Sequence, residues 1–158
     1  MKISSIMSSD LEVLITELEA KKTDEKAKLE ALEARILKLE QDQAEREVKK
    51  NRKFQTRCIQ IAKEIFNEEP IIEYHPPFLN GLELDAFFQK YRIALEMQGA
   101  QHRLHSTSWY KDVKKLEDIV NRDRRKRCIC QDNGISLLEV WYDEKPEIVI
   151  PKRIRLFI

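Results

Sequence analysis

The chain has 158 residues, of which 36% are charged and 42% hydrophobic, and 29 Lys and Arg nearly balance 28 Asp and Glu. Only three residues are glycine, whereas an average globular domain has about 7% glycine and about 25% charged residues, so collagen-like and low-complexity classes are excluded. No run of about 18 uncharged apolar residues occurs, and the sequence therefore predicts no membrane span.

The cysteines indicate the cellular compartment. Cys58, Cys128 and Cys130 are an odd and sparse set for a disulfide framework, which favours a reducing environment. The first ten residues carry one lysine and no apolar core, which argues against a secretory signal. We therefore expect an intracellular protein, either cytoplasmic or nuclear.

The first 69 residues contain no glycine or proline and hold 14 basic and 15 acidic residues. Without a turn signal, this half is expected to be helical almost throughout. Within residues 10–50 the side chains follow a heptad pattern in which seven of ten core positions are apolar. Lys22 and Glu25 interrupt the seam, and the pattern fades after Leu39. The pattern favours pairing with another helix, most simply in a homodimer, and the alternatives are a solvated helix or a poorly ordered arm. The core positions are Leu11, Ile15, Leu18, Lys22, Glu25, Leu29, Leu32, Ile36, Leu39 and Gln43.

A polar stretch at residues 44–53 interrupts the pattern, and apolar residues then resume at a helical spacing from Phe54 to Phe66. We expect this second stripe to pack onto the C-terminal part of the chain rather than to extend the coiled coil. The domain boundary is therefore predicted after residue 50, with a helical segment at 1–50 and a second domain at 51–158.

In the second half the apolar period changes to two, which is typical of strands. Residues 82–88 and 93–98 predict an antiparallel hairpin with a two-residue loop at 89–90. In that register Asp85 and Glu96 lie on one face as diagonal neighbours. Two carboxylates placed in this way can share a divalent cation. The alternative is that this face is the solvated side of a half-buried hairpin.

A loop of about 14 residues follows the hairpin and contains His102 and Trp109, and loops of this length are more often functional than merely connecting. A helix is then expected from about residue 112 to residue 132. Its apolar stripe continues onto Asp123, and an acid on an inward stripe is costly unless it binds a cation or a histidine. The basic block at residues 122–127 is a solvated face, a set of phosphate contacts or a nuclear-import signal.

The remaining residues predict further strands. Residues 135–142 are almost continuously apolar, which is typical of a buried central strand. Residues 147–158 alternate and predict one or two edge strands broken by Pro151. The fold class expected from these elements is α+β (α/β), with a long N-terminal helix before a small domain.

The second half resembles the core of the restriction-endonuclease-like (PD-(D/E)XK) nucleases, and most nearly the branch of the very-short-patch-repair endonucleases. The stretches that carry the resemblance are LELDAFFQKYRIALEMQGAQH, NRDRRKR and NGISLLEVWYDE, within residues 54–144. The resemblance implies a mixed central sheet flanked by helices and an endonuclease that hydrolyses phosphodiester bonds in DNA. It also implies Mg²⁺, or Mn²⁺, as the cofactor.

The resemblance assigns a role to each matching residue. Asp85 is the principal metal ligand and Glu96 the second, and Gln98 stands where many relatives have a lysine that positions the attacking water. His102 matches the general base and Asp123 the acid that orients it. In the implied chemistry, phosphates would be held by Arg124, Arg125, Lys126 and Arg127. Trp109 would either stack on a base or anchor its loop in the core.

Two departures from the family pattern keep other interpretations open. Gln98 lacks the positive charge of a lysine, and the acid that relatives carry on the first helix has no clear counterpart. A catalytically degenerate nuclease fold, acting as a coiled-coil interaction or nucleic-acid-binding module, is the second interpretation. A structural dimer without nucleic acid is the third, because residues 70–158 carry 15 basic and 13 acidic residues, a net charge of only +2.

Overall fold

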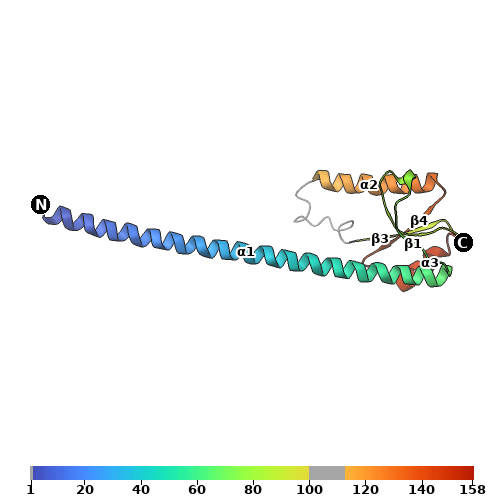
Figure 1. Cartoon of the computed structure of the whole chain (residues 1–158), viewed down its shortest axis with the longest axis horizontal. Coiled ribbons are helices and arrows are strands. Elements are labelled where there is room, and N and C mark those ends of the chain that lie inside the picture. Colours follow the sequence, from blue (N-terminus) through green and yellow to red (C-terminus); the bar gives the residue numbers. More distant parts are fainter. Residues whose placement is uncertain (1, 100–112) are drawn as a thin grey trace. The chain divides into compact units, whose positions relative to one another are not determined.

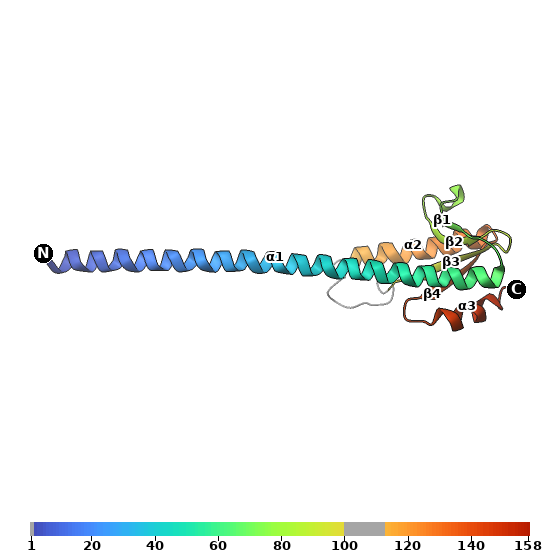
Figure 2. The same cartoon turned by 60° about the horizontal axis from the view of Figure 1, so that its bottom comes forward.

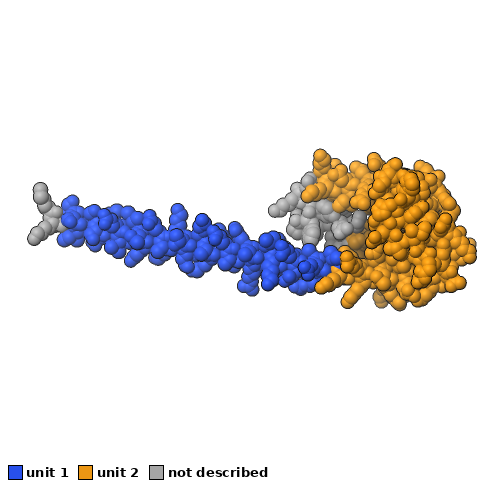
Figure 3. Space-filling model, viewed as in Figure 1, with its two compact units in different colours: residues 1–48 blue, residues 49–158 orange. Residues whose placement is uncertain are grey.

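The computed structural model describes residues 2–99 and 113–158. The chain divides into two compact units, residues 1–48 and residues 49–158, where the sequence predicts a boundary after residue 50 (Figure 3). The element order is α1 (Lys2–Phe66), β1 (Ile71–Tyr74), the 3₁₀ helix η1 (Pro77–Leu79), β2 (Leu84–Phe88), β3 (Ile93–Gln98), α2 (Val113–Asp132), β4 (Ser136–Trp141) and α3 (Pro146–Ile154) (Figure 1). This order confirms the long N-terminal helix and the α+β class.

Helix α1 continues without a break through the polar stretch at residues 44–53, so this stretch changes the surface of the helix and does not interrupt it. Its glutamates and lysines are strong helix formers. Ion pairs one turn apart add a few tenths of a kcal/mol each, as between Lys28 and Asp24 at 2.5 Å. The helix ends before Asn67, whose left-handed φ of 49° is typical of a helix C-terminus. Among the described residues, no helix is both long and apolar enough to cross a membrane.

The last turns of α1 pack onto the sheet of the second unit, which confirms the prediction for the second apolar stripe. Cys58, Ala62 and Phe66 are buried in one cluster with Phe88 of β2 and Leu95 of β3. Helix α3 contributes to the same cluster, so residues from both ends of the unit form its core. The other face of the sheet is covered by α2 (Figures 1 and 2).

The four strands form one mixed sheet in the order β1-β2-β3-β4. Strand β2 is antiparallel to both β1 and β3, and β4 runs parallel to β3. A parallel connection needs a crossover, and α2 supplies it over one face of the sheet. Glycine ends this helix as expected, because Gly134 has a φ of 66°, in the left-handed region.

The register of the β2–β3 hairpin differs from the predicted one. Phe88 pairs with Ile93, where a two-residue loop requires Tyr91. The loop therefore has four residues, 89–92, and Arg92 adopts a φ of 54° and donates its N–H to the Gln89 carbonyl. A slip of two residues leaves every side chain on its predicted face, which is why the assignment of faces is correct although the register is wrong.

Two other predictions for the second unit are wrong. Strand β4, expected in the centre, lies at one end of the sheet, and its apolar run reflects helices over both faces. The segment expected to form edge strands is helix α3 instead. Its buried residues Pro146, Ile150 and Ile154 recur every four positions, which is a helical period that the alternating isoleucines conceal. Strand β1 has no counterpart in the sequence prediction.

The stability of the second unit should depend on the ring of Phe88, which is fully buried and lies 4.7 Å from the ring of Phe66. We expect Phe88→Ala to lower the free energy of unfolding by about 3–5 kcal/mol, through lost burial and the cavity left behind. Urea titration followed by tryptophan fluorescence measures this, because both tryptophans belong to residues 49–158. The control is Phe157→Ala, whose ring is 46% exposed and should matter by less than about 0.5 kcal/mol. Equal effects of the two variants would contradict the core assignment.

Candidate active site

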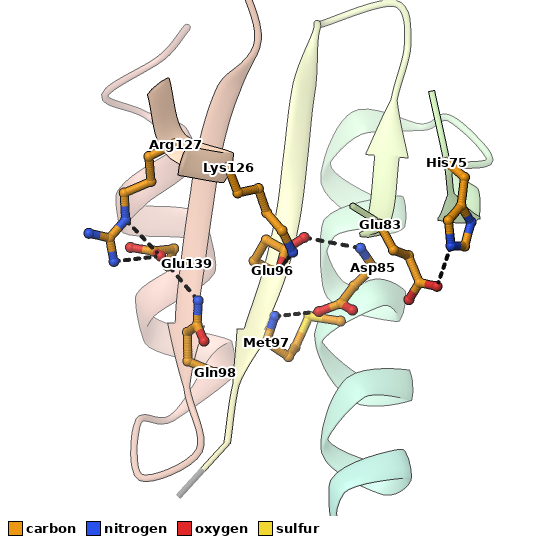
Figure 4. Close-up of polar contacts among 9 residues, drawn as sticks. All are labelled: His75, Glu83, Asp85, Glu96, Met97, Gln98, Lys126, Arg127 and Glu139. Atoms are coloured by element: carbon orange, nitrogen blue, oxygen red, sulfur yellow. Dashed lines mark hydrogen bonds and ion pairs between the residues drawn. The ribbon is translucent and has the colours of Figure 1, made fainter. Parts of the chain in front are cut away.

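The candidate site lies on the face of the sheet that α2 covers. Side chains alternate between the two faces of a strand, so Glu96 and Gln98 of β3 point to the same face, and Asp85 of β2 joins them. Helix α2 brings Lys126 and Arg127 to this face from above (Figure 4). Acids and bases from three elements thus meet in one place.

Asp85 and Glu96 are direct neighbours across the hairpin. The observed register, continued by one residue beyond Ala86 and Leu95, sets them opposite each other. The N–H of Asp85 donates to Glu96 Oε1 at 3.3 Å, and the N–H of Met97 donates to Asp85 Oδ2 at 2.8 Å (Figure 4). Each carboxylate is therefore held by a backbone group of the opposite strand, which fixes the pair just beyond the last paired residues, Ala86 and Leu95.

Lys126 neutralises this acidic pair in part. Its Nζ donates to Glu96 Oε2 at 2.9 Å, and the two side chains are only 12% and 7% exposed. Burying such a pair costs several kcal/mol of desolvation for each ion, which the attraction between them offsets only in good geometry. Removing either partner would leave an uncompensated buried charge. The position of α2 is thus tied to the acids beneath it.

The two carboxylates both have a raised pKa. Burial raises the pKa of Asp85, and the hydrogen bond from the Met97 N–H and the charge of Lys126 oppose that rise. For Glu96, burial and the neighbouring charge of Asp85 raise the pKa to about 7, against the opposing effect of Lys126. Two adjacent acids whose environment disfavours double ionisation attract a cation, and perturbed pairs of this kind are concentrated at functional sites.

Glu139 of β4 is a site residue that the sequence analysis did not identify. It stands opposite Glu96 in the parallel β3–β4 register. Its Oε1 accepts hydrogen bonds from Gln98 Nε2 at 3.1 Å and from Arg127 Nη2 at 2.9 Å. The available signal was a single acid within the apolar run at residues 135–142. The amide of Gln98 is therefore bonded to Glu139.

The structure brings half of the ten predicted site residues together. Asp85, Glu96, Gln98, Lys126 and Arg127 lie side by side. Lys126 is largely buried against Glu96, whereas Arg127 binds Glu139 while its side chain stays 51% exposed. A solvated hairpin face is ruled out, because Glu96 and Gln98 are only 6% and 5% exposed.

The other predicted residues lie elsewhere or outside the described part of the chain. Arg124 and Arg125 are exposed on α2, and Asp123 is half-buried on the same helix. His102 and Trp109 are outside the described residues, so the base and the stacking residue of the resemblance stay predictions.

Asp85 and Glu96 are the residues of this site that could hold a divalent cation. Within residues 2–99 and 113–158, no group of three or more His, Cys, Asp and Glu side chains is arranged to hold a metal. Mg²⁺, however, is commonly bound by one or two carboxylates, with waters and substrate phosphates completing its shell. Asp85 and Glu96, which are neighbours on adjacent strands, would offer that minimal set in their ionised form, with Lys126 bonded to Glu96 in the free protein.

Comparison with known proteins adds relatives but no activity. No family model matches the chain, and no solved structure does. It is similar to uncharacterized protein 307L of Invertebrate iridescent virus 6 (33% identity over 90 residues), uncharacterized protein 033L of Invertebrate iridescent virus 3 (30% over 82) and uncharacterized protein 094L of Frog virus 3 (isolate Goorha) (36% over 75). These matches cover 50%, 48% and 45% of this chain and 46%, 42% and 46% of the relatives, so the chain spans less than half of their length. Their names state no activity.

The raised pKa of Glu96 makes the stability of the fold depend on pH. The folded carboxyl group keeps its proton up to about pH 7, whereas its ordinary pKa is 4.5. Because the folded state binds this proton more tightly than the unfolded state does, protonation of Glu96 stabilises the fold. This stabilisation is complete below pH 4.5 and is lost as the pH rises through about 7. We expect the free energy of unfolding to fall by about 2–3 kcal/mol more between pH 5 and pH 8 in the unaltered chain than in Glu96→Gln.

The measurement is a urea titration at both pH values, and the readout is the difference between them. That difference is independent of any general loss of stability caused by the variant. The control Glu45→Gln removes an exposed carboxylate of α1 and should keep the pH dependence of the unaltered chain. The same pH dependence in Glu96→Gln would show that Glu96 does not titrate as described.

Proposed function

We propose that this protein is a metal-dependent endonuclease that hydrolyses phosphodiester bonds in DNA and acts inside the cell, in the cytoplasm or the nucleus. One observation carries the proposal: Asp85 and Glu96 form a buried pair with raised pKa values, fixed by backbone groups of the opposite strands. Such a pair lowers the stability of the fold near neutral pH, so we expect it to serve a function, and cation binding is the function that two neighbouring carboxylates support.

The arrangement of the elements supports the same proposal. The nuclease resemblance rests on the order helix, hairpin, helix and strand, with the two acids on neighbouring strands of the hairpin. The second unit has this order, in a mixed sheet with a helix on each face and a final strand parallel to the one that carries Glu96. The restriction-endonuclease-like fold is thus part of the proposal.

In the proposed chemistry Asp85 and Glu96 hold Mg²⁺ or Mn²⁺. A bound divalent ion polarises a phosphoryl oxygen and lowers the pKa of a bound water. Lys126 supplies the positive charge that Gln98 lacks, because its Nζ reaches the Glu96 carboxylate from α2. The Gln98 amide positions Glu139, whose Oε1 also accepts a hydrogen bond from Arg127. Arg124 and Arg125 are exposed and are the residues that we assign to phosphate contacts.

A second candidate function is favoured by the hydrogen bonds that Lys126 and Gln98 already make within the protein. Lys126 is bonded to Glu96 and Gln98 to Glu139, so both side chains that could orient a water already have partners. This supports a nuclease fold that has lost catalysis and acts as a coiled-coil interaction or nucleic-acid-binding module. Pairing of α1 in a homodimer belongs to both candidates, since the apolar seam of residues 11–39 is exposed in the single chain.

A cleavage assay separates the two candidates. Plasmid and single-stranded DNA are incubated with the protein and Mg²⁺ or Mn²⁺, and nicked and linear products are quantified on gels. We expect Asp85→Asn and Glu96→Gln each to slow cleavage by at least about 100-fold, because each removes a proposed metal ligand. Lys126→Met should slow it by about 10- to 100-fold, because it removes a positive charge beside that site. The control Glu45→Gln should cleave at the rate of the unaltered chain. Cleavage that survives the Asp85→Asn/Glu96→Gln double variant would refute the site, and binding without any cleavage would favour the degenerate fold.

A binding assay tests the assignment of the exposed arginines. The logarithm of the DNA affinity should fall linearly with the logarithm of the salt concentration, by about 0.9 for each phosphate contact. We expect Arg124→Gln/Arg125→Gln to reduce that slope by about 2, equally for unrelated sequences. Lys152→Gln, which removes an exposed charge on α3, is the matched control and should leave the slope unchanged. An affinity that does not respond to salt would exclude phosphate contacts altogether.

A further inference from the structure

Residues 28–40 of α1 present a continuous apolar seam. Leu29, Leu32, Ile36 and Leu39 occupy four successive core positions of the heptad pattern, and their side chains are 55–57% exposed. Burying a leucine or isoleucine side chain is worth about 1.5–3 kcal/mol relative to leaving it in water. Four such residues form one apolar row on a helix that is otherwise mostly charged and polar, and an exposed row of this kind indicates pairing with a second helix.

We propose that residues 28–40 pair with the same residues of a second copy of this chain in a parallel, in-register, two-stranded coiled coil. The proposal deepens the homodimer of the proposed function by giving its orientation and register. It does not rest on nuclease chemistry, and it concerns residues of the first unit only.

Charges beside the seam select the parallel orientation. Lys28 and Arg35 precede the two core positions Leu29 and Ile36, and Glu33 and Glu40 follow the core positions Leu32 and Leu39. In a parallel dimer the flanking residue before one core position meets the partner's residue five positions later. The resulting pairs are Lys28 with the second copy's residue 33 and Arg35 with its residue 40, both of opposite charge.

An antiparallel dimer would have the opposite electrostatics. In that orientation each flanking row faces the same row of the other copy. Lys28 and Arg35 would meet one another across one side of the seam, and Glu33 and Glu40 across the other. Like charges in such positions are destabilising, so the charge pattern disfavours antiparallel pairing.

The polar interruption of the seam fixes the register. Lys22 and Glu25 occupy core positions, and a slip by one heptad would place Lys22 against an apolar core residue, Ile15 or Leu29, of the other copy. A charge left among apolar residues is costly, and a lysine at one core position is a known means of setting register and the number of strands. In register, the polar layers of the two copies meet each other instead.

The favourable region also has defined ends. The next flanking pairs, Lys21 with residue 26 and Asp42 with residue 47 of the second copy, carry like charges in the parallel alignment. Within the single chain Lys28 is bonded to Asp24, but both side chains are more than 60% exposed, so this pair is weak and readily exchanged. Attractive pairs and unbroken core thus coincide at residues 28–40.

Cysteine crosslinking of the full chain tests the orientation. In a Cys128→Ser background, which removes the exposed native thiol, Leu18→Cys and Leu39→Cys place single thiols at two core positions far apart. A parallel, in-register dimer forms a disulfide between copies at both sites under mild oxidation, at least about tenfold faster than the outward-facing control Ala34→Cys. An antiparallel dimer brings a residue opposite its own copy at one point only, so crosslinking at no more than one site overturns the proposal.

Charge variants provide a second test that needs no cysteine. Glu33→Lys/Glu40→Lys turns all the flanking pairs of a parallel dimer repulsive, and we expect the dissociation constant measured by sedimentation to rise at least about tenfold. Adding Lys28→Glu/Arg35→Glu restores opposite charges and should restore the dimer. In an antiparallel dimer like charges face each other in all three proteins, so equal affinities overturn the proposal.

Two further measurements are the mass of the dimer and the effect of an Asp85 variant on dimerisation. Sedimentation should give the mass of two chains of 18.8 kDa, and a monomer or trimer overturns the proposal. Asp85→Asn, which should slow cleavage at least about 100-fold, is expected to leave the dissociation constant of the dimer unchanged. Failure of the nuclease function and failure of the coiled coil are therefore distinguished in the same set of proteins.

Discussion

The second unit is arranged around two carboxylates that lie beneath a helix. Asp85 and Glu96 are neighbours on adjacent strands, and a covered face of a sheet is an unfavourable place for either charge. Backbone N–H groups of the opposite strands and the ammonium group of Lys126 compensate them. The position of α2, and with it the crossover to the parallel strand β4, satisfies that electrostatic requirement while it covers the apolar residues around it.

This compensation is incomplete, which connects the fold to the proposed function. The pKa of both acids stays raised, chiefly by burial, although Lys126 lowers it, so the surroundings disfavour ionisation of both carboxyl groups at once. A purely structural pair would be expected to be balanced or replaced by apolar residues, which often pack at no loss of stability. The second acid–base group, around Glu139, lies on the same face and ties β3, β4 and α2 together through Gln98 and Arg127.

Much of the architecture follows from local patterns. The absence of glycine and proline before residue 70, together with strong helix formers, dictates α1, and the alternation in residues 82–98 assigns each side chain to a face. The hairpin register does not follow, because the loop depends on Arg92 adopting a left-handed φ and bonding to the carbonyls of Asn133 and Gly134. Helix α3 was missed because alternating isoleucines conceal its four-residue repeat.

The long helix, the heptad seam, the hairpin and the placing of the two acids on one strand face follow from local residue patterns. The contact of Lys126 with Glu96, the contacts of Glu139 with Gln98 and Arg127, and the place of β4 at the end of the sheet follow only from the folded arrangement. These partners are 12 to 41 residues apart in the chain. No local period encodes such a distance, because strand pairing and the crossover of α2 set it, and both depend on how the whole unit buries its apolar faces.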